Sequence, residues 1–209
     1  MPDWDDIFAE QGRVFTEPHS CLERVVRVFI DHQVKRVLDL GCGTGRHLVH
    51  LSKLGFDVWG FDVSPQAVSM ALEWLTEEGL TADIQEHSME ETFPYVDAFF
   101  DAVISTQVIH HNRMSDIMFT VREIERVLGS GGVLFVTFPI YSFVPSEGDM
   151  DWKLEQIEPG TYIPRNGPEA GIPHHYFTLE EIDTVFSGFE IMDIFTDETK
   201  HRCVLGIKK

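Results

Sequence analysis

Basic residues are scarce in this 209-residue chain. It holds 16 Lys and Arg against 35 Asp and Glu, which gives a formal net charge of −19. A chain with this charge repels the phosphate backbone of nucleic acids at long range, and no basic stripe offsets the repulsion. We therefore expect no nucleic-acid partner.

Long apolar runs are also missing, and cysteines are few. No run reaches the roughly 18–20 residues that a membrane helix needs, and the first residues carry neither a basic region nor an apolar stretch. The three cysteines form no Cys-x-x-Cys pair that would suggest a metal site, and they suggest no disulfide framework. These absences predict a cytoplasmic protein without a signal peptide, a membrane partner or disulfides.

The residues that are present predict a layered α/β fold. Hydrophobic residues make up 43% of the chain and charged residues 24%, as in globular proteins, and the length suits one domain. Strand-like and helix-like segments alternate between Lys35 and Phe138. This alternation predicts a mostly parallel sheet with helices on both faces and a ligand site at the carboxyl edge of its strands.

Helix starts and a C-terminal strand pair complete this pattern. Ser20-x-x-Glu23, Ser64-Pro65, Ser115 and Thr178-x-x-Glu181 predict the N-caps of four helices. Two strands, over residues 189–195 and 201–207, are joined by a short polar turn. Such a turn joins antiparallel neighbours, so one strand must run against the parallel set.

Prolines divide the chain further. Six of the ten fall between Pro139 and Pro173, which predicts an irregular excursion of the kind that forms lids or binding loops. We expect a single domain, 1–209, with four parts. They are an N-terminal cover and helix (1–34), a core (35–138), a lid or acceptor insertion (139–177), and a C-terminal helix with a strand pair (178–209).

The glycine-rich loop in Val37–Gly45 is the most informative segment. A strand ends there in glycines and a helix begins directly, so the backbone can approach a ligand and present free N–H groups to it. The spacing G-x-G-x-G matches neither the dinucleotide fingerprint nor the Walker loop. The preceding Asp39 would repel a pyrophosphate but attract an ammonium group.

A second carboxylate narrows the choice of ligand. Asp62 ends the second strand, 21 positions after Gly41, where it is placed to accept both hydroxyls of a ribose. With Asp39, it describes a ligand that has a ribose, no phosphate and a cationic amino-acid end. S-adenosylmethionine (SAM) fits that description.

The glycine loop, the segment with Asp62 and three later segments follow one another along the chain. In this order the sequence resembles the SAM-dependent methyltransferases with a Rossmann-like fold. The resemblance covers roughly Lys35 to Phe138. It implies an α/β fold with a seven-stranded, mostly parallel sheet, helices on both faces and an antiparallel last strand. The sequence looks most like the small-molecule branch, similar to the domain of tellurite-resistance-type and ubiquinone-pathway-type enzymes. The matching segments are Val37–Gly45, Gly60–Ser64, His87–Met89, Phe100–Ser105 and Val127–Gly132.

The resemblance also implies a set of cofactor contacts. The glycines would approach SAM through their backbone, Asp39 would face its ammonium group, and Asp62 would bind its ribose. Val63 would pack on the adenine, and Met89 would pack on it or offer it a backbone N–H. Ser88 stands where many relatives have an aspartate that binds the adenine amino group. Cys42 is interpreted as a small loop residue and not as a nucleophile. The full predicted set is Asp39, Gly41, Cys42, Gly43, Thr44, Gly45, Asp62, Val63, Ser88, Met89, Thr106 and Gln107.

Histidines follow the fourth strand at the predicted ligand edge. His110 and His111 are candidate catalytic residues, since a histidine can act as a general base near neutral pH. The alternative is that they pack and cap the loop. Two histidine pairs could in principle bind a metal, but no Asp, Glu or Cys spacing supports one, so we predict no metal.

Two further segments are candidates for the acceptor site. His174, His175 and Tyr176 end the proline-rich excursion and would face the acceptor if that excursion is a lid. The alternative is a surface turn or a core tyrosine. Trp4 and Phe15 bound an apolar N-terminal stretch that either covers the cofactor or serves as a packing arm.

These observations predict in-line methyl transfer from SAM to a small-molecule acceptor, with S-adenosylhomocysteine as product. Three alternatives stay open. One is aminopropyl transfer from a decarboxylated relative of SAM, and another is a non-catalytic SAM-binding regulatory or interaction module. An NAD-dependent oxidoreductase is disfavoured by the G-x-G-x-G spacing and by Asp39. We expect a monomer or homodimer.

Overall fold

A seven-stranded sheet forms the centre of the computed structural model, which describes residues 4–13, 15–140 and 153–209. The strand order is β3-β2-β1-β4-β5-β10-β9. Strands β3 to β5 are parallel, whereas β10 runs antiparallel to both neighbours. The predicted sheet with one reversed strand is therefore confirmed. The bounds are β1 Arg36–Leu40, β2 Asp57–Asp62, β3 Asp83–Glu86, β4 Phe100–Thr106, β5 Leu128–Pro139, β9 Phe189–Thr196 and β10 His201–Lys208.

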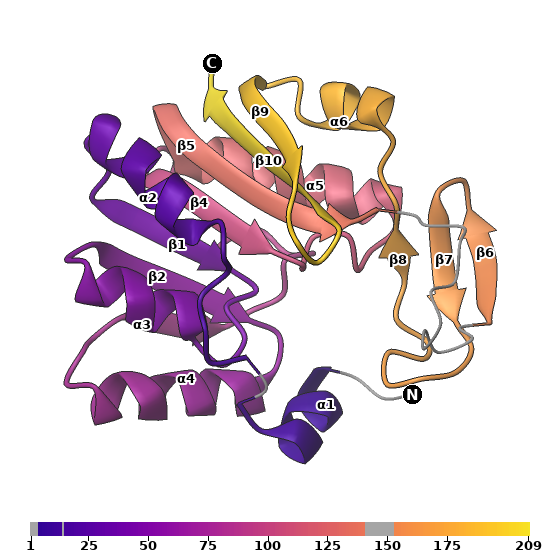
Figure 1. Cartoon of the computed structure of the whole chain (residues 1–209), viewed down its shortest axis with the longest axis horizontal. Coiled ribbons are helices and arrows are strands. Elements are labelled where there is room, and N and C mark those ends of the chain that lie inside the picture. Colours follow the sequence, from indigo (N-terminus) through magenta and orange to yellow (C-terminus); the bar gives the residue numbers. More distant parts are fainter. Residues whose placement is uncertain (1–3, 14, 141–152) are drawn as a thin grey trace.

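Helices cover both faces of this sheet (Figure 1). Helices α2 (Leu22–Asp31) and α3 (Arg46–Lys53) pack on one face, and α5 (Met114–Val127) and α6 (Leu179–Val185) pack on the other. Alternate residues of a strand point to opposite faces, so the central strands supply both apolar layers. In β4, for example, Val103 joins the layer under α5, whereas Ile104 joins the layer under α2.

Local capping signals explain two of the helix starts. Helix α4 (Pro65–Glu77) begins after Ser64, whose hydroxyl accepts the Ala67 N–H at 3.0 Å. Helix α6 begins after Thr178, which forms the predicted reciprocal capping box with Glu181. Each cap satisfies backbone N–H groups that have no partner inside the helix.

Two other predicted caps are wrong. Helix α2 begins at Leu22, so its N-cap position is Cys21 and not Ser20, and no side chain makes a capping hydrogen bond there. Helix α5 begins at Met114, one residue before Ser115. Its first N–H donates to the Glu158 carboxylate at 2.7 Å, so a distant side chain caps this helix.

The proline-rich excursion is more regular than predicted. In its described part, β6 (Leu154–Glu158), β7 (Thr161–Pro164) and β8 (His174–His175) form an antiparallel sheet in the order β6-β7-β8. Pro159 lies between two strands and Pro164 ends one, positions at which no ladder hydrogen bond is lost. Residues 141–152 of the predicted lid lie outside the described residues.

Helix α1 (Trp4–Gln11) and the β6–β8 sheet lie on either side of one end of the main sheet (Figure 1). Both therefore lie near the carboxyl ends of the parallel strands, where the ligand site is predicted. Within the described residues, no helix combines the length and the apolar character needed to cross a bilayer.

Candidate functional site

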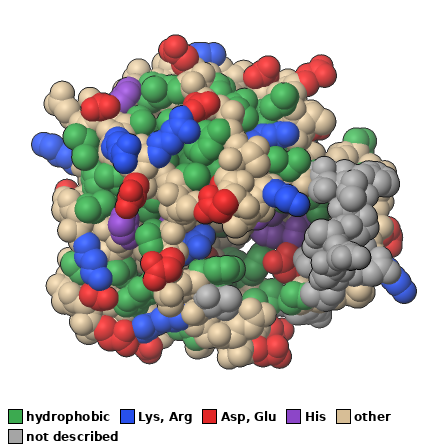
Figure 2. Space-filling model, in the orientation of Figure 1, with side chains coloured by type: hydrophobic (Ala, Val, Ile, Leu, Met, Phe, Trp, Pro, Cys, Tyr) green, Lys and Arg blue, Asp and Glu red, His purple; other side chains and the backbone are tan. Residues whose placement is uncertain are grey.

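A cavity of about 440 Å³ lies at the carboxyl ends of β1, β2 and β4. Its volume falls in the range of small-molecule and cofactor sites, roughly 300–1,000 Å³. In Figure 2 the surface is hollowed beside the centre, and histidine side chains are visible inside. The wall includes many predicted cofactor residues: Gly41, Cys42, Gly43, Thr44, Asp62, Val63, Ser88, Met89, Thr106 and Gln107.

The glycine loop turns between β1 and α3. Gly41, Gly43 and Gly45 have φ values of 69°, 51° and 92°, which residues other than glycine rarely adopt. Gly45 is the N-cap of α3 and does not line the cavity, unlike the other two glycines. Burial raises the pKa of the neighbouring Cys42 well above its usual value, and the charge of Asp62 adds to this effect. The thiol therefore stays protonated, in agreement with a packing role.

Asp62 connects the end of β2 to the glycine loop. Its Oδ2 accepts the Gly43 N–H at 2.8 Å, and its Oδ1 accepts the Ser64 N–H at 3.0 Å. Burial raises the pKa of Asp62, while these two N–H groups stabilise the charged form and limit the rise. Each carboxylate oxygen has a second lone pair, so Asp62 can accept further hydrogen bonds from a ligand in the cavity.

Asp39 lies behind the cavity wall and does not line it. It is 1% exposed, and its Oδ2 lies 3.6 Å from Nδ1 of His47. Among the described residues, that oxygen has no hydrogen-bond partner. Arg46 lines the cavity, and its pKa is lowered by burial, an effect that the charge of Asp39 opposes. Asp39 thus adds negative charge behind this wall, and the predicted direct contact with an ammonium group stays a prediction.

The predicted adenine region forms another part of the wall. Val63 is 52% exposed, so an apolar ligand surface can pack on it. Met89 is anchored by its carbonyl, which accepts the Thr120 hydroxyl at 2.9 Å. The Ser88 hydroxyl accepts a hydrogen bond from the Glu90 N–H at 3.2 Å within a local turn. Ser88 itself lines the cavity. Sequence analysis did not assign Glu90 to the site.

Strand β4 ends with Thr106 at the cavity edge, and Gln107 follows it there. Gln107 has a φ of 61°, and its N–H donates to the Thr137 hydroxyl at 3.0 Å. This strained turn is typical of functional sites, where the surrounding structure fixes an unfavourable backbone. It directs the following residues, including His110 and His111, into the cavity wall.

His110 and His111 are weakly basic in this setting. Burial lowers the pKa of His110 well below its usual value, and neighbouring histidines lower it further. Burial, followed by the charge of His174, lowers the pKa of His111 to about 3. Both imidazoles are therefore neutral near pH 7, and a general base with so low a pKa has little driving force to accept a proton. The predicted base role stays a prediction that this geometry does not favour.

The end of the excursion brings His174 and Tyr176 into the wall, whereas His175 faces away. The His175 ring contacts the Thr161 hydroxyl at 2.8 Å and packs against Phe177. Its backbone N–H donates to the His110 carbonyl at 2.7 Å and so ties the excursion to the loop after β4. His175 is thus a connecting residue, and its predicted contact with an acceptor has no support in this arrangement.

Helix α1 contributes Trp4 and Phe8 to the cavity wall, so it lies where the predicted cover would lie. The Asp5 carboxylate accepts hydrogen bonds from the Ser64 hydroxyl at 2.7 Å and from the Gln66 N–H at 2.8 Å. Trp4 packs edge-on against His111, with ring centroids 4.8 Å apart. Trp4 and Phe15 both line the cavity, although Phe15 is 57% exposed.

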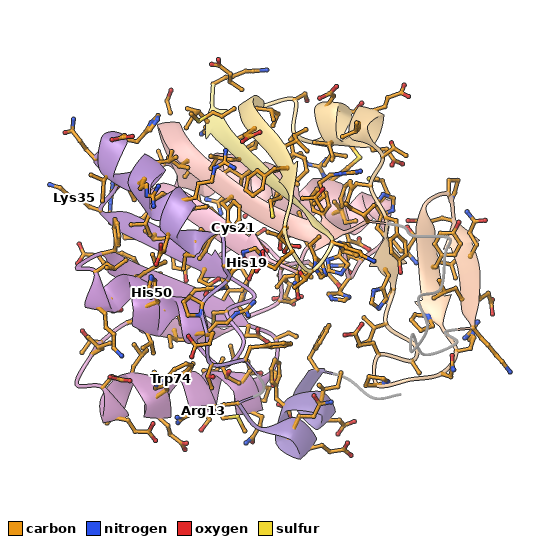
Figure 3. All side chains as sticks on the ribbon, in the orientation of Figure 1. Arg13, His19, Cys21, Lys35, His50 and Trp74 are labelled. Carbon is orange, nitrogen blue, oxygen red and sulfur yellow. The ribbon has the colours of Figure 1, made fainter. Side chains whose placement is uncertain are left out.

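The chain after α1 is held against α4. Arg13 pairs with Glu77 at 2.7 Å and lies over the Trp74 ring, 5.6 Å from its centroid. Figure 3 shows Arg13 and Trp74 together beside α1. The cavity wall also contains residues that sequence analysis did not assign to the site: Arg46, Glu90, Val108, Glu169 and His201. The first three directly follow predicted site residues in the chain, whereas Glu169 and His201 come from distant segments.

Comparisons with known proteins agree with this geometry. Residues 38–136 match the family described as "Methyltransferase domain". Glycine/sarcosine N-methyltransferase of Aphanothece halophytica is 28% identical over 147 residues, which are 69% of this chain and 54% of that protein. Ubiquinone biosynthesis O-methyltransferase of Xanthomonas axonopodis pv. citri (strain 306) is 31% identical over 102 residues, 49% of this chain and 42% of that protein. The chain spans about half the length of these relatives.

The fold has equally clear counterparts. A crystal structure of an S-adenosylmethionine-dependent methyltransferase from Clostridium acetobutylicum ATCC 824 superposes with a TM-score of 0.73. The match covers 97% of this chain and 96% of that one, at 16% sequence identity. At this identity the likeness establishes the fold, including the α/β sheet order that places the glycine loop and Asp62 at one edge.

Proposed function

We propose that this chain is a methyltransferase that transfers a methyl group from SAM to a small-molecule acceptor. The match to the methyltransferase-domain family and the shared fold support this proposal. The observation that carries the proposal is the position of Asp62. One carboxylate fixes the glycine loop through Gly43 and also lines the cavity. A ligand with a ribose would find its hydrogen-bond acceptor and its backbone loop already aligned.

The residues of this chain divide the work between binding and enclosure. Asp62 and the N–H groups of the glycine loop would hold the ribose and amino-acid parts, and Val63 and Met89 would pack on the adenine. Bound SAM supplies a methyl group on a positively charged sulfur, so no covalent enzyme intermediate is required. The protein's remaining task is to align the acceptor and exclude water.

The elements around the cavity favour a small acceptor. Helix α1 crosses from Ser64 to His111 on one side, and His174 and Tyr176 close another side. The net charge of −19 disfavours nucleic acid as the acceptor. By their names, the relatives above act on glycine or sarcosine and in ubiquinone biosynthesis, both small-molecule chemistry. We keep the cytoplasm as the proposed location because the described cysteines are free thiols.

Calorimetric titration with SAM, S-adenosylhomocysteine and NAD tests the cofactor assignment. We expect both sulfur ligands to bind and NAD not to bind. Asp62→Ala should weaken SAM binding at least about tenfold, or about 1.4 kcal/mol, because the ribose acceptor and the anchor of Gly43 are both lost. Asp57→Ala is the matched control, because Asp57 is exposed at the opposite end of β2. Unchanged affinity in a folded Asp62 variant would remove the ribose assignment.

Turnover is tested separately with methyl-labelled SAM and a panel of amine, hydroxyl and thiol acceptors. Label transfer to an acceptor supports the proposed enzyme. If SAM binds but no acceptor in the panel is methylated, the binding-module alternative is favoured instead.

A further inference from the structure

Three histidines from two distant segments meet in the cavity wall. His110 and His111 follow β4, and His174 belongs to β8. One ring nitrogen of each lies within 4.8 Å of the corresponding nitrogens of the other two. The His110 and His111 ring centroids are 3.9 Å apart, and those of His111 and His174 are 4.6 Å apart. Clustered imidazoles of this kind need a physical reason.

Hydrogen bonds supply only part of that reason. His174 pairs with Glu169. The backbone of Pro173 and Gln107 offers hydrogen bonds to the His111 ring. Nδ1 of His110 and Nδ1 of His111 are buried and have no hydrogen-bond partner in the described part of the chain. His110 is 3% exposed and His174 is 4% exposed, so bulk water has little access to either ring. Buried polar atoms are almost always satisfied in native proteins, and an exception indicates a missing water, ion or ligand.

The ligand chemistry suits a cation. His110, His111 and His174 bring ring nitrogens close together in the cavity wall, and a neutral imidazole nitrogen has a lone pair that can bind a metal ion. The Glu169 carboxylate lies 3.1 Å from Nε2 of His174. Neutral imidazoles beside one carboxylate are a common donor set for metal ions.

We propose that His110, His111 and His174 bind a divalent transition-metal ion in the cavity, with Glu169 supplying negative charge beside it. Imidazole nitrogen suits Zn²⁺, Fe²⁺, Co²⁺ or Ni²⁺, whereas Mg²⁺ and Ca²⁺ prefer oxygen ligands. In a tetrahedral site with Zn–N bonds of about 2.0–2.1 Å, ligand nitrogens are roughly 3.4 Å apart. The ring nitrogens lie within 4.8 Å of one another, so a shift of at most about 1.4 Å brings them to that spacing.

The site would also define the acceptor. The three histidines line the same cavity as Asp62 and the glycine loop, so the ion would face whatever binds beside SAM. A Lewis acid there lowers the pKa of a coordinated hydroxyl or thiol, and the released proton passes to solvent. This step, which rests on the proposed function, favours an acceptor with an ionisable oxygen or sulfur atom. Metal binding itself does not depend on that function.

A second cluster in the described residues is an alternative candidate for a metal site. His19, Asp197 and Cys203 also bring possible ligand atoms within 4.8 Å of one another. However, His19 is already paired with Asp197 at 3.0 Å, and Asp197 Oδ1 accepts hydrogen bonds from Thr199 and His201. Those contacts account for this cluster as part of the β9–β10 turn. It therefore serves as the internal control.

Zinc titration of the purified full chain, after chelator treatment and dialysis, tests the proposal. We expect one equivalent of Zn²⁺ to bind in calorimetry and elemental analysis, and to raise Tm. His110→Gln and His174→Gln should each weaken Zn²⁺ binding by roughly 10–100-fold or more, and Glu169→Gln by roughly tenfold. His19→Gln, the matched control, should bind Zn²⁺ like the wild type. Absence of Zn²⁺ and Co²⁺ binding to the wild type, or loss of binding only in His19→Gln, would overturn the proposal.

Cobalt spectroscopy keeps the test decisive if the histidine variants do not fold. Co²⁺ bound by the three imidazoles should give visible ligand-field bands without a thiolate charge-transfer band. A thiolate band would place the ion at a cysteine and contradict the proposed site. SAM titration of the same samples separates the two hypotheses. Zn²⁺ binding without SAM binding would support the metal site and reject the proposed cofactor. SAM binding without Zn²⁺ binding would support the cofactor and reject the metal site.

Discussion

Gly41, Gly43 and Gly45 of the glycine loop share positive φ values but differ in what surrounds them. A Cβ on Gly41 would lie 2.4 Å from Val108, and one on Gly45 would lie 2.9 Å from Cβ of Ala71. A Cβ on Gly43 would meet only the Phe8 ring, at 3.5 Å. Gly41 and Gly45 are therefore required by packing within the protein. Gly43 is the glycine whose missing side chain leaves space at the cavity.

We predict that two alanine substitutions in this loop affect different properties, one mainly the stability and the other mainly the SAM affinity. Both carry the strain of a left-handed residue, roughly 1–2 kcal/mol, but Gly45→Ala adds the overlap with Ala71. Gly45→Ala should lower the free energy of unfolding in urea more than Gly43→Ala does. Gly43→Ala should lower SAM affinity in calorimetry by about tenfold, or about 1.4 kcal/mol. If Gly43→Ala is the more destabilising variant and binds SAM normally, the division between packing and ligand approach is wrong.

Among the elements, α1 has two attachments that bridge the cavity. Asp5 accepts hydrogen bonds at the N-terminus of α4, and Trp4 contacts His111 on the far wall. The hydrogen bonds from Ser64 and Gln66 lower the pKa of the Asp5 carboxyl, so it is charged near neutral pH. None of the residues of this helix is buried. Helices with so little burial open at low free-energy cost.

Removing the Asp5 carboxylate should therefore loosen the cover. Asp5→Ala is expected to speed amide hydrogen exchange over residues 4–11 and to increase the rate of SAM dissociation several-fold. Tm should change little, because α1 contributes no buried apolar residue. Glu10→Ala is the matched control, since Glu10 is exposed on the same helix. Equal exchange and dissociation rates in both variants would mean that Asp5 does not hold the cover closed.

Which elements could be predicted depends on the range of the interactions that fix them. Ser64 and Thr178 cap their helices through residues three positions away, so the sequence alone reveals these starts. The start of α5 depends on Glu158, which reaches it from β6. No local pattern near Ser115 contains that information. The sequence pattern does not predict the β6–β8 sheet, because its strands are short and flanked by prolines, which are typical of irregular segments.

The site divides in the same way. The glycine loop and Asp62 belong to consecutive strand–loop–helix units, so their convergence follows from the parallel sheet. The histidine cluster depends on how β8 returns to the loop after β4, where the His175 N–H meets the His110 carbonyl. Glu169 joins the cluster only through that return. A donor set assembled from such distant segments has no spacing that sequence analysis can recognise.

At the level of the folded chain, buried histidines link stability to pH. The pKa values of six histidines are lowered, and burial is the largest cause for each: His19, His50, His110, His111, His175 and His201. When the chain unfolds below about pH 6.5, these rings take up protons that the folded protein does not bind. The unfolded state then binds more protons, so stability must rise with pH in this window.

The free energy of unfolding should therefore be near its plateau above pH 6.5 and fall as the pH is lowered from 6.5 towards 5. His111, with a pKa of about 3, contributes a slope of up to about 1.4 kcal/mol per pH unit over this range. Urea unfolding at pH 7.5, 6.5 and 5.5, with a chelator present, measures the slope. His111→Gln should flatten it, and because both proteins share the other charges, the difference isolates this residue. Identical slopes would show that His111 does not carry a depressed pKa in the folded protein.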